Sequence, residues 1–369
     1  MKKKNSINIK EICEKLFKEN NFKIIYESSK DGYLISLSKN LDKYLEEIKK
    51  IEKKTTLINN TLIENIENLN KTLLNVIKIY LEGKSGQAYI EFKNKMDTFI
   101  YIAGKLRKKL KIDDRVSFYR VRTSMNEVSK IEQLFHIPFD QRELVSTQRY
   151  SISGVPSLYL GSSIYCCWLE IGKPSLSQMY ISRFQNIREI DILDFTISYD
   201  NFIPKNLDDW NDDFNKGKED LFKSYLLMYP LIMACSYRKQ FDSKPFIIEY
   251  IIPNLLLQWI QDEKSQVDAI QYYSTKADIS EYTKNLVLPP KDFNYKYCSE
   301  LVDSFTLTIP ASWQLLDIFD KNIKQNNYTT IGKEENIQDL VIRNYQYTRF
   351  YSIEEHLKKL ELKKVNLTN

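Results

Sequence analysis

The hydrophobic period of this chain changes after about Val116, and that change limits the folds that the chain can adopt. Between Thr55 and Leu110, apolar residues recur at spacings of three and four, which is the period of amphipathic helices. After Val116 come short apolar and aromatic runs separated by turns, which is the pattern of strands. The apolar positions of the first region are Ile58, Leu62, Ile66, Leu69, Leu73, Ile77 and Tyr80, followed by Tyr89, Phe92, Met96 and Phe99.

The first region is expected to hold two long antiparallel helices. The glycines of EGKSGQ, at 82–87, end the first helix and allow the second to fold back against it. Ahead of these helices we predict a short helix from Ile7 and then a hairpin in FKIIYESSKDGYLISLS. In that segment Asp31-Gly32 is a turn signal between two β-rich runs.

The second region predicts an α+β domain. Strands are expected in SFYRVR, PSLYLG, QMYISRF, REIDILDF, FIIEYII, AIQYYS, NLVLP and SFTLTIP, with helices near 219–239 and 254–261 among them. The order is mixed and not a regular βαβ alternation. A charged helix is expected at 352–363. The predicted division is a mainly helical N-terminal domain over 1–112, an α+β domain over 113–320 and a C-terminal extension over 321–369.

Composition excludes several classes of protein. The net charge of +5 comes from 54 basic and 49 acidic residues, an excess too small and dispersed to indicate nucleic-acid binding. Five cysteines without metal-ligand spacing favour reduced thiols in a cytoplasm and no metal site. The start MKKKNSINIK lacks the apolar run of a secretory signal, and no stretch approaches the ~20 apolar residues of a membrane helix. We therefore expect a cytoplasmic protein with no membrane segment.

The common catalytic motifs are missing. The chain contains no GxGxxG, GxxxxGK[ST], HExxH or GxSxG, and its histidines are His136 and His356. We expect His136, next to an Ile-Pro-Phe run, to be a packed or hydrogen-bonded loop residue and not a base. Histidine-based mechanisms therefore have little support.

The stretch QRYSISGVPSLYLGSSIYCCWLEIG brings three reactive side-chain types into one turn-strand-helix unit. Arg149 precedes a serine-glycine turn, Tyr159 lies in the strand, and Glu170 lies in a helix that Ser162 or Ser163 could cap. Arginine offers a planar fork for a pyrophosphate, tyrosine a face for stacking, and glutamate a negative charge for a developing oxocarbenium ion. Each residue also has an ordinary structural explanation, so the residue types alone do not decide between a functional and a structural role.

This stretch resembles the core of the RES-domain family, which is named for its Arg, Glu and Ser. The family pattern has an opening tyrosine-arginine strand, matched here by Arg120 in FYRVR, and an Arg followed by a turn glycine. An LY strand follows ten residues after that Arg and a Glu eleven residues later, as in Arg149, Tyr159 and Glu170.

The resemblance continues in the second half of the chain and covers about 117–310. The segment IIPNLLLQWIQDEKSQVDAIQYYSTKAD is similar to the family's late helix followed by a strand that ends in tyrosine and serine. It points to Tyr273 and Ser274. The next run, NLVLPP, also suits the family.

The resemblance implies an ADP-ribosyltransferase-like fold and an enzyme that degrades NAD⁺, releasing nicotinamide by hydrolysis or by phosphorolysis. NAD⁺ would then be the substrate, inorganic phosphate a further substrate in phosphorolysis, and no cofactor would be needed. Nicotinamide leaves as a neutral molecule and needs no general acid, so the scarcity of histidine is no objection. The resemblance implies that Arg149, with Arg120, binds the phosphates and that Tyr159 packs against nicotinamide or its ribose. Glu170 would bind the ribose and stabilise its developing charge, and Ser274 would orient the substrate. Arg122 and Tyr273 are weaker substrate-binding candidates.

Two alternatives stay open. An ADP-ribosyltransferase would use the same site to modify a protein or nucleic acid, and a non-enzymatic regulatory protein would use the helical region to bind partners. Because loss of NAD⁺ is toxic, the resemblance fits a toxin or antiviral effector with a neutralising or activating protein partner. The helical region would control the enzyme or make it a homo-oligomer.

Overall fold

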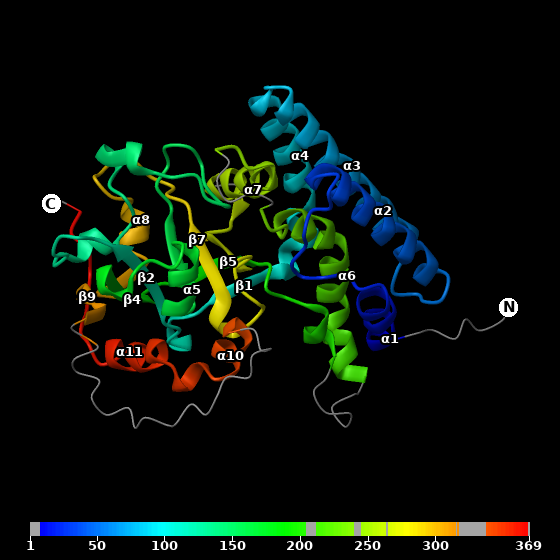
Figure 1. Ribbon diagram of the computed structural model, residues 1–369. Helices are drawn as coiled ribbons and strands as arrows, with labels where there is room; N and C mark the ends of the chain where they lie inside the picture. Colours follow the sequence, from blue (N-terminus) through cyan, green and yellow to red (C-terminus); the bar gives the residue numbers. More distant parts are fainter. Residues whose placement is uncertain are drawn as a thin grey trace. The chain divides into compact units, whose positions relative to one another are not determined.

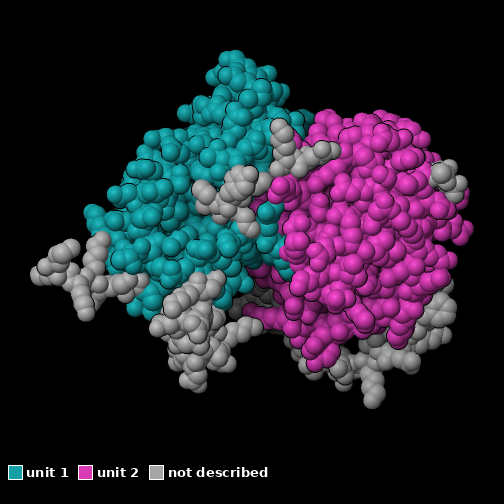
Figure 2. Space-filling view, turned by 180° about the vertical axis from the view of Figure 1, so that it is seen from behind, with its two compact units in different colours: residues 1–108, 148–150, 194–259 teal, residues 109–147, 151–193, 260–369 magenta. Residues whose placement is uncertain are grey.

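The computed structural model describes residues 8–203, 212–239, 245–262, 265–314, 316 and 337–367. The chain splits into two compact units, which we call the helical unit and the sheet unit (Figure 2). This division differs from the predicted domains, because the chain after the first strands returns to the helical unit. The helical unit comprises Met1–Lys108, Gln148–Tyr150 and Asp194–Trp259, and the sheet unit comprises Lys109–Thr147, Ser151–Leu193 and Ile260–Asn369.

The helical unit is built around α3, which packs against α2, α4 and α6 (Figure 1). Asn59 caps the start of α3 by accepting a hydrogen bond from the backbone N–H of Leu62 at 2.9 Å. Gly83, with φ of +83°, follows its end, so the two long helices and the glycine turn between them are confirmed. The helices are α1 (Ile9–Cys13), followed by a π-helical turn (Glu14–Glu19), α2 (Tyr33–Glu52), α3 (Asn60–Leu81), α4 (Ser85–Ala103), α6 (Asp212–Cys235) and α7 (Ile251–Gln261), of which all but the last two residues belong to this unit.

The predicted hairpin around Asp31-Gly32 is wrong. A turn does form, with Ser29 and Gly32 bridged through the backbone, but the run after it is helix α2 and not a strand. The apolar residues of that run continue at helical spacing through Leu41 and Ile48, and the helix buries them as one face. The longer helical period thus overrides the local β-propensity.

The strand predicted in FIIEYII is also wrong. Its residues form a 3-10 turn (Ile248–Tyr250) and the first turn of α7. Ile252, Leu256 and Trp259 are buried at spacings of four and three, which fits a helix face. A continuous apolar run does not distinguish a buried strand from a buried helix by period.

Tyrosines supply much of the core of the helical unit. Tyr44 donates its hydroxyl hydrogen bond to the carbonyl of Leu226 at 2.8 Å, and Tyr33 donates to that of Ala234 at 2.9 Å. Each ring adds buried apolar area while its hydroxyl finds a partner, which avoids the cost of burying an unpaired polar group. These bonds connect α2 to α6.

The sheet unit contains a ten-stranded sheet among the described residues, in the order β1-β5-β6-β7-β3-β2-β4-β8-β10, with β9 beside β4. Seven of the eight predicted strand runs are confirmed, and every pair of strands with an assigned register is antiparallel. With its helices, the chain has the predicted α+β character. The strands are β1 (Arg107–Leu110), β2 (Phe118–Thr123), β3 (Leu158–Gly161), β4 (Met179–Asn186), β5 (Ile190–Asp194), β6 (Ala269–Tyr273), β7 (Lys284–Leu288), β8 (Phe305–Thr308), β9 (Ala311–Ser312) and β10 (Leu362–Lys363).

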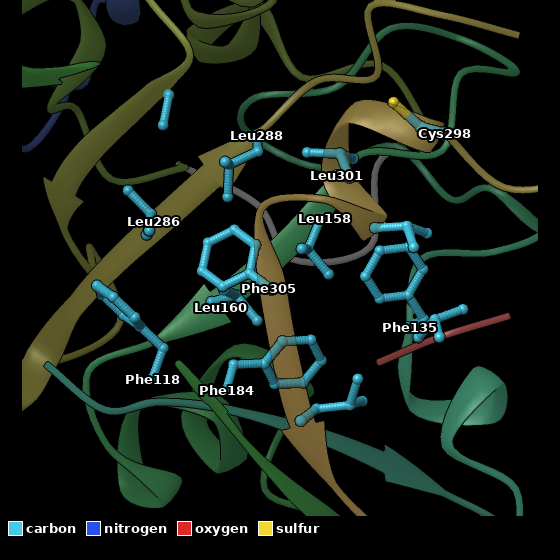
Figure 3. Packing of buried hydrophobic residues seen from close by; sticks show 14 of the residues in the cluster. Phe118, Phe135, Leu158, Leu160, Phe184, Leu286, Leu288, Cys298, Leu301 and Phe305 are labelled. Carbon is cyan, nitrogen blue, oxygen red and sulfur yellow. The ribbon is translucent and has the colours of Figure 1, made fainter. Parts of the chain in front are cut away.

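The two faces of the sheet are covered differently. One face carries an apolar cluster that includes Phe118, Leu160 and Leu286, beside α8 (Ser299–Val302) (Figure 3). The other face, with Tyr119 and Val121, packs against α5 (Ile164–Glu170) and α11 (Arg349–Leu357). Because side chains alternate along a strand, each strand residue can be assigned to the face of α5 or to the opposite face.

Gly161 is predicted to be indispensable for the packing of α5. A Cβ atom there would lie 2.7 Å from Cys167 Sγ and 3.1 Å from the backbone oxygen of Ser163. Gly161→Ala should therefore lower the free energy of unfolding by about 1–3 kcal/mol, measured by denaturant titration. Gly86→Ala is the control, because nothing lies within 4 Å of its Cβ position in α4. It should be neutral or stabilise by up to about 1 kcal/mol. Equal stability of Gly161→Ala and the unmodified chain would contradict the close approach.

Candidate functional site

Helix α5 carries the best candidate residue, Glu170, at its last position. Ser163 caps the start of the helix, its Oγ accepting a hydrogen bond from the backbone N–H of Cys166 at 2.9 Å. The prediction that a serine caps this helix is confirmed, and so is the placement of Glu170 in it. Cys167 fixes the helix further, since its thiol donates to the carbonyl oxygen of Tyr119 on β2 at 3.1 Å.

The carboxylate of Glu170 is held from two sides. Asn285 Nδ2 donates a hydrogen bond to Oε1 at 2.7 Å, and Lys276 Nζ lies 3.5 Å from Oε2. Lys276 Nζ also donates to the backbone oxygen of Glu170. The side chain of Glu170 is 30% exposed, so a partly solvated carboxylate is kept in a fixed direction.

Asn285, on β7, has its amide oriented by its neighbours. It is buried, and its Oδ1 accepts a hydrogen bond from the thiol of Cys166 at 3.3 Å. Burial raises the pKa of Cys166 well above its usual range, so the thiol stays protonated and donates. A carboxylate only accepts, so the amide nitrogen must face Glu170.

Ser274 connects to this carboxylate through Lys276. Its backbone N–H donates to the carbonyl of Thr283 at 2.7 Å, and its Oγ accepts from the backbone N–H of Lys276 at 3.2 Å. The side chain of Ser274 is fully buried. The serine therefore shapes the turn that brings Lys276 to Glu170.

Tyr159 lies on the same face of the sheet as Asn285. It is paired with Val287 on β7, and Asn285 pairs with Gly161, two positions away on each strand. Because Leu158 and Leu160 belong to the opposite cluster, alternation places Tyr159 on the face of α5. The structure thus brings Tyr159, Glu170 and Ser274 to one region of the sheet unit.

Arg120, Arg122 and Tyr273 alternate onto the other face. Arg120 and Arg122 have the parity of Phe118 on β2, and Tyr273 is paired with Lys284, which has the parity of Leu286 on β7. The two arginines therefore share one face of β2. Side-chain alternation along the strands therefore places all three residues on the face opposite Tyr159.

The guanidinium of Arg120 nevertheless reaches the backbone beside Tyr159. Strands β2 and β3 pair only at Tyr119 and Gly161, and Arg120 Nη1 donates to the carbonyl oxygen of Tyr159 at 2.9 Å. Its Nε is buried without a hydrogen-bond partner, and no carboxylate forms an ion pair with Arg120 in the described part of the chain. Burial, more than the nearby Arg122, lowers the pKa of Arg120 to about 10. A partly buried cation without a counter-ion is costly, which indicates a place for an anion.

Arg149 belongs to the helical unit, whereas the other predicted site residues belong to the sheet unit. It donates hydrogen bonds to the carbonyls of Cys235 at 3.0 Å and Tyr237 at 2.7 Å, and its guanidinium lies 4.9 Å from the ring centroid of Tyr250. These carbonyls lie at the end of α6, so Arg149 caps the C-terminus of that helix. Sequence reasoning could not assign this contact because it joins residues 86 positions apart.

His136 is a packed residue, as predicted. Its Nε2 accepts a hydrogen bond from the backbone N–H of Cys298 at 3.0 Å, so its Nδ1 carries the proton and donates to the carbonyl of Ile137 at 2.7 Å. Burial lowers its pKa to about 4. Over the described ranges, no group of three or more His, Cys, Asp and Glu side chains is arranged to hold a metal ion.

The C-terminal segment contributes directly to the region of Glu170. Glu354 of α11 is buried, and its Oε1 accepts hydrogen bonds from the backbone N–H of Ile164 at 2.7 Å and from Tyr345 Oη at 2.6 Å. The Tyr345 ring stacks on Tyr282, with centroids 4.1 Å apart. The segment 337–357, predicted as part of an extension, therefore holds both the start of α5 and the loop that contains Ser274.

Three comparisons with known proteins add to this description. No family model and no solved structure matches the chain. A protein of Bacillus subtilis (strain 168) named "Putative toxin YopC" is 33% identical over 289 residues, or 73% of this chain, which spans 64% of that relative's length. The "Major capsid protein" of Human herpesvirus 7 (strain JI) is 26% identical over 101 residues, covering 27% of this chain and 7% of the viral protein. So small a share of the viral protein carries no argument.

As for the membrane prediction, none of the helices within the described ranges is both long and apolar enough to cross a bilayer.

Glu354 should make the stability of the sheet unit depend on pH. Burial raises its pKa to about 7 from an ordinary 4.5, outweighing the hydrogen bonds from Tyr345 and Ile164 that lower it. The folded state therefore binds the proton more tightly than the unfolded state. This stabilisation is complete below about pH 4.5 and is lost as the pH rises through 7, by at most about 3 kcal/mol.

The measurement compares denaturant unfolding of the unmodified chain and Glu354→Gln at pH 5 and pH 8. The unmodified chain should lose more stability across this range than the variant, because glutamine does not titrate. Identical pH profiles for the two proteins would show that Glu354 is not buried against α5.

Proposed function

We propose that this chain is a toxin that degrades NAD⁺ by breaking the bond between nicotinamide and ribose. The relative named as a toxin supports the toxic role. The resemblance to RES-domain proteins supports the choice of NAD⁺. The observation that carries the proposal is the carboxylate of Glu170, held by Asn285 and Lys276 on the face of the sheet that Tyr159 shares.

The proposed reaction places positive charge where that carboxylate can offset it. When the bond between the ribose C1′ and the pyridinium nitrogen breaks, both electrons go to nitrogen, and nicotinamide leaves as a neutral molecule. The ribose then carries an oxocarbenium charge, which Glu170 would stabilise. Oxygen from water or inorganic phosphate forms the new bond at C1′, and water loses a proton in doing so.

The two oxygens of Glu170 are suited to different tasks. Oε1 accepts the 2.7 Å hydrogen bond from Asn285, which fixes the plane of the carboxylate. Oε2 has the longer contact of 3.5 Å with Lys276, so it can accept a ribose hydroxyl. Tyr159 would pack against nicotinamide or its ribose, and Ser274 would keep Lys276 in place.

We assign the pyrophosphate first to Arg120. Its guanidinium has a buried, unsatisfied Nε and lacks a carboxylate partner among the described residues, so a phosphate would supply the missing charge. Arg149, by contrast, already donates to two backbone carbonyls and stacks on Tyr250. Its role in phosphate binding stays a prediction from the family pattern.

The acceptor of ADP-ribose separates this proposal from an ADP-ribosyltransferase. Incubating the full chain with NAD⁺, with and without phosphate, and identifying the products by mass distinguishes hydrolysis, phosphorolysis and transfer to a macromolecule. An unchanged NAD⁺ pool, both in vitro and in a bacterial host that expresses folded protein, would favour a non-enzymatic role.

Replacements of Glu170 and Arg120 should change different kinetic constants. Glu170→Gln keeps the size of the side chain but removes its charge, so kcat should fall by about 10² or more. This corresponds to a rise in the activation free energy on the order of 3 kcal/mol. Arg120→Lys keeps the charge but loses the planar fork, so KM for NAD⁺ should rise more than kcat falls. Steady-state rates of nicotinamide release measure both effects.

Glu361→Gln is the matched control, because the side chain of Glu361 is 80% exposed and lies near the C-terminus. It should leave both constants unchanged, with circular dichroism confirming that every variant folds. Near-normal turnover by folded Glu170→Gln would remove this residue from the mechanism.

A further inference from the structure

A polar hollow lies in the sheet unit, and Glu170 is not among the residues that line it. Its volume is about 700 Å³, within the ~300–1,000 Å³ common for small-molecule sites. The chain after β2 forms part of its wall, including the 3-10 turns Ile131–Leu134 and Phe139–Leu144. Charged residues and a tyrosine dominate its lining, namely Arg122, Glu127, Lys130, Glu132, Lys296 and Tyr297.

Arg122 is the least exposed cation of this hollow. It is half-buried, and its Nη1 donates to the carbonyl oxygen of Gln133 at 2.6 Å. Over the described ranges its side chain makes no other hydrogen bond and no ion pair, although Glu127 and Glu132 line the same hollow. Burial lowers the pKa of Arg122, so the guanidinium has lost part of its hydration. Its remaining donors are suited to an external anion.

The other charged side chains that line the hollow also form no ion pairs within the described part of the chain. Lys130 and Lys296 add two ammonium groups, and neither forms an ion pair within the described part of the chain. Glu127 and Glu132 likewise form none there and can accept hydrogen bonds from hydroxyl groups. A ligand that combines an anion with several hydroxyls matches this lining better than a simple anion, which the carboxylates would repel.

We propose that this hollow binds a phosphorylated sugar, with the phosphate on Arg122 and the lysines and the hydroxyls on the glutamates. The site is distinct from the proposed NAD⁺ site, because the residues placed there, Tyr159, Glu170 and Arg120, do not line this hollow. The proposal does not depend on NAD⁺ cleavage. The ligand chemistry has two sources, a free sugar phosphate or the ADP-ribose part of a nucleotide.

Isothermal titration of the full chain with ribose 5-phosphate, ADP-ribose and inorganic phosphate tests the proposal. Ribose 5-phosphate or ADP-ribose should bind more tightly than phosphate, and the tighter of the two identifies the source. Arg122→Gln should weaken that binding by at least about tenfold, as expected when a charged hydrogen-bonding partner is lost. Glu132→Gln should reduce the difference in affinity between ribose 5-phosphate and inorganic phosphate.

Arg343→Gln is the control, because it removes the same charge from an exposed position on α10 (Ile337–Arg343) and should leave binding unchanged. If Arg122→Gln does not fold, Lys296→Gln at the exposed rim takes its place. No binding of either sugar phosphate at millimolar concentration, or equal binding by Arg122→Gln, overturns the proposal. Loss of binding in Arg120→Lys with full binding in Arg122→Gln would place the ligand in the proposed NAD⁺ site and overturn it as well.

Discussion

The arrangement of the candidate site depends on how closely α5 approaches strand β3. At Gly161 the thiol of Cys167 takes the space that a side chain would need. That approach lets Cys167 bond to β2, and Cys166 to Asn285 on β7. Glu170 ends the same helix and meets the other side of the Asn285 amide. One glycine thus allows the contacts that fix the carboxylate.

Helix α5 is too short to be stable alone, since isolated helices of fewer than ~12–15 residues are marginal in water. Its start is held by the Ser163 cap and by the carboxylate of Glu354, and its side by the apolar cluster of Tyr165, Leu169 and Tyr345. The C-terminal segment that supplies Glu354 and Tyr345 also packs on the loop after β6. Glu170 and Lys276 are therefore positioned by the same distant part of the chain.

Local patterns predicted much of the fold and part of the site. Helices α3 and α4, seven strands, the serine cap of α5 and the strand position of Tyr159 follow from period and turn chemistry. The failure at α2 occurs where local β-propensity competes with a helical period that extends beyond the run, and the failure in FIIEYII occurs where a continuous apolar run has no distinctive period. Asn285 lies in NLVLPP and Lys276 in YYSTKAD, both noted for their resemblance, but their contacts with Glu170 span more than 100 residues and depend on strand order. Likewise, alternation along FYRVR puts Arg120 and Arg122 on the same face of their strand but does not say which face of the sheet that is.

The central claim is that Asn285 acts on NAD⁺ cleavage by orienting Glu170. A double-mutant cycle with Asn285→Ala and Glu170→Ala, read as the rate of nicotinamide release, tests it most directly. We predict that Asn285→Ala slows the reaction when Glu170 is present and has no further effect when alanine stands at position 170. Rate losses that multiply in the double variant would show that Asn285 acts independently of Glu170, and full activity of Glu170→Ala would contradict the account altogether.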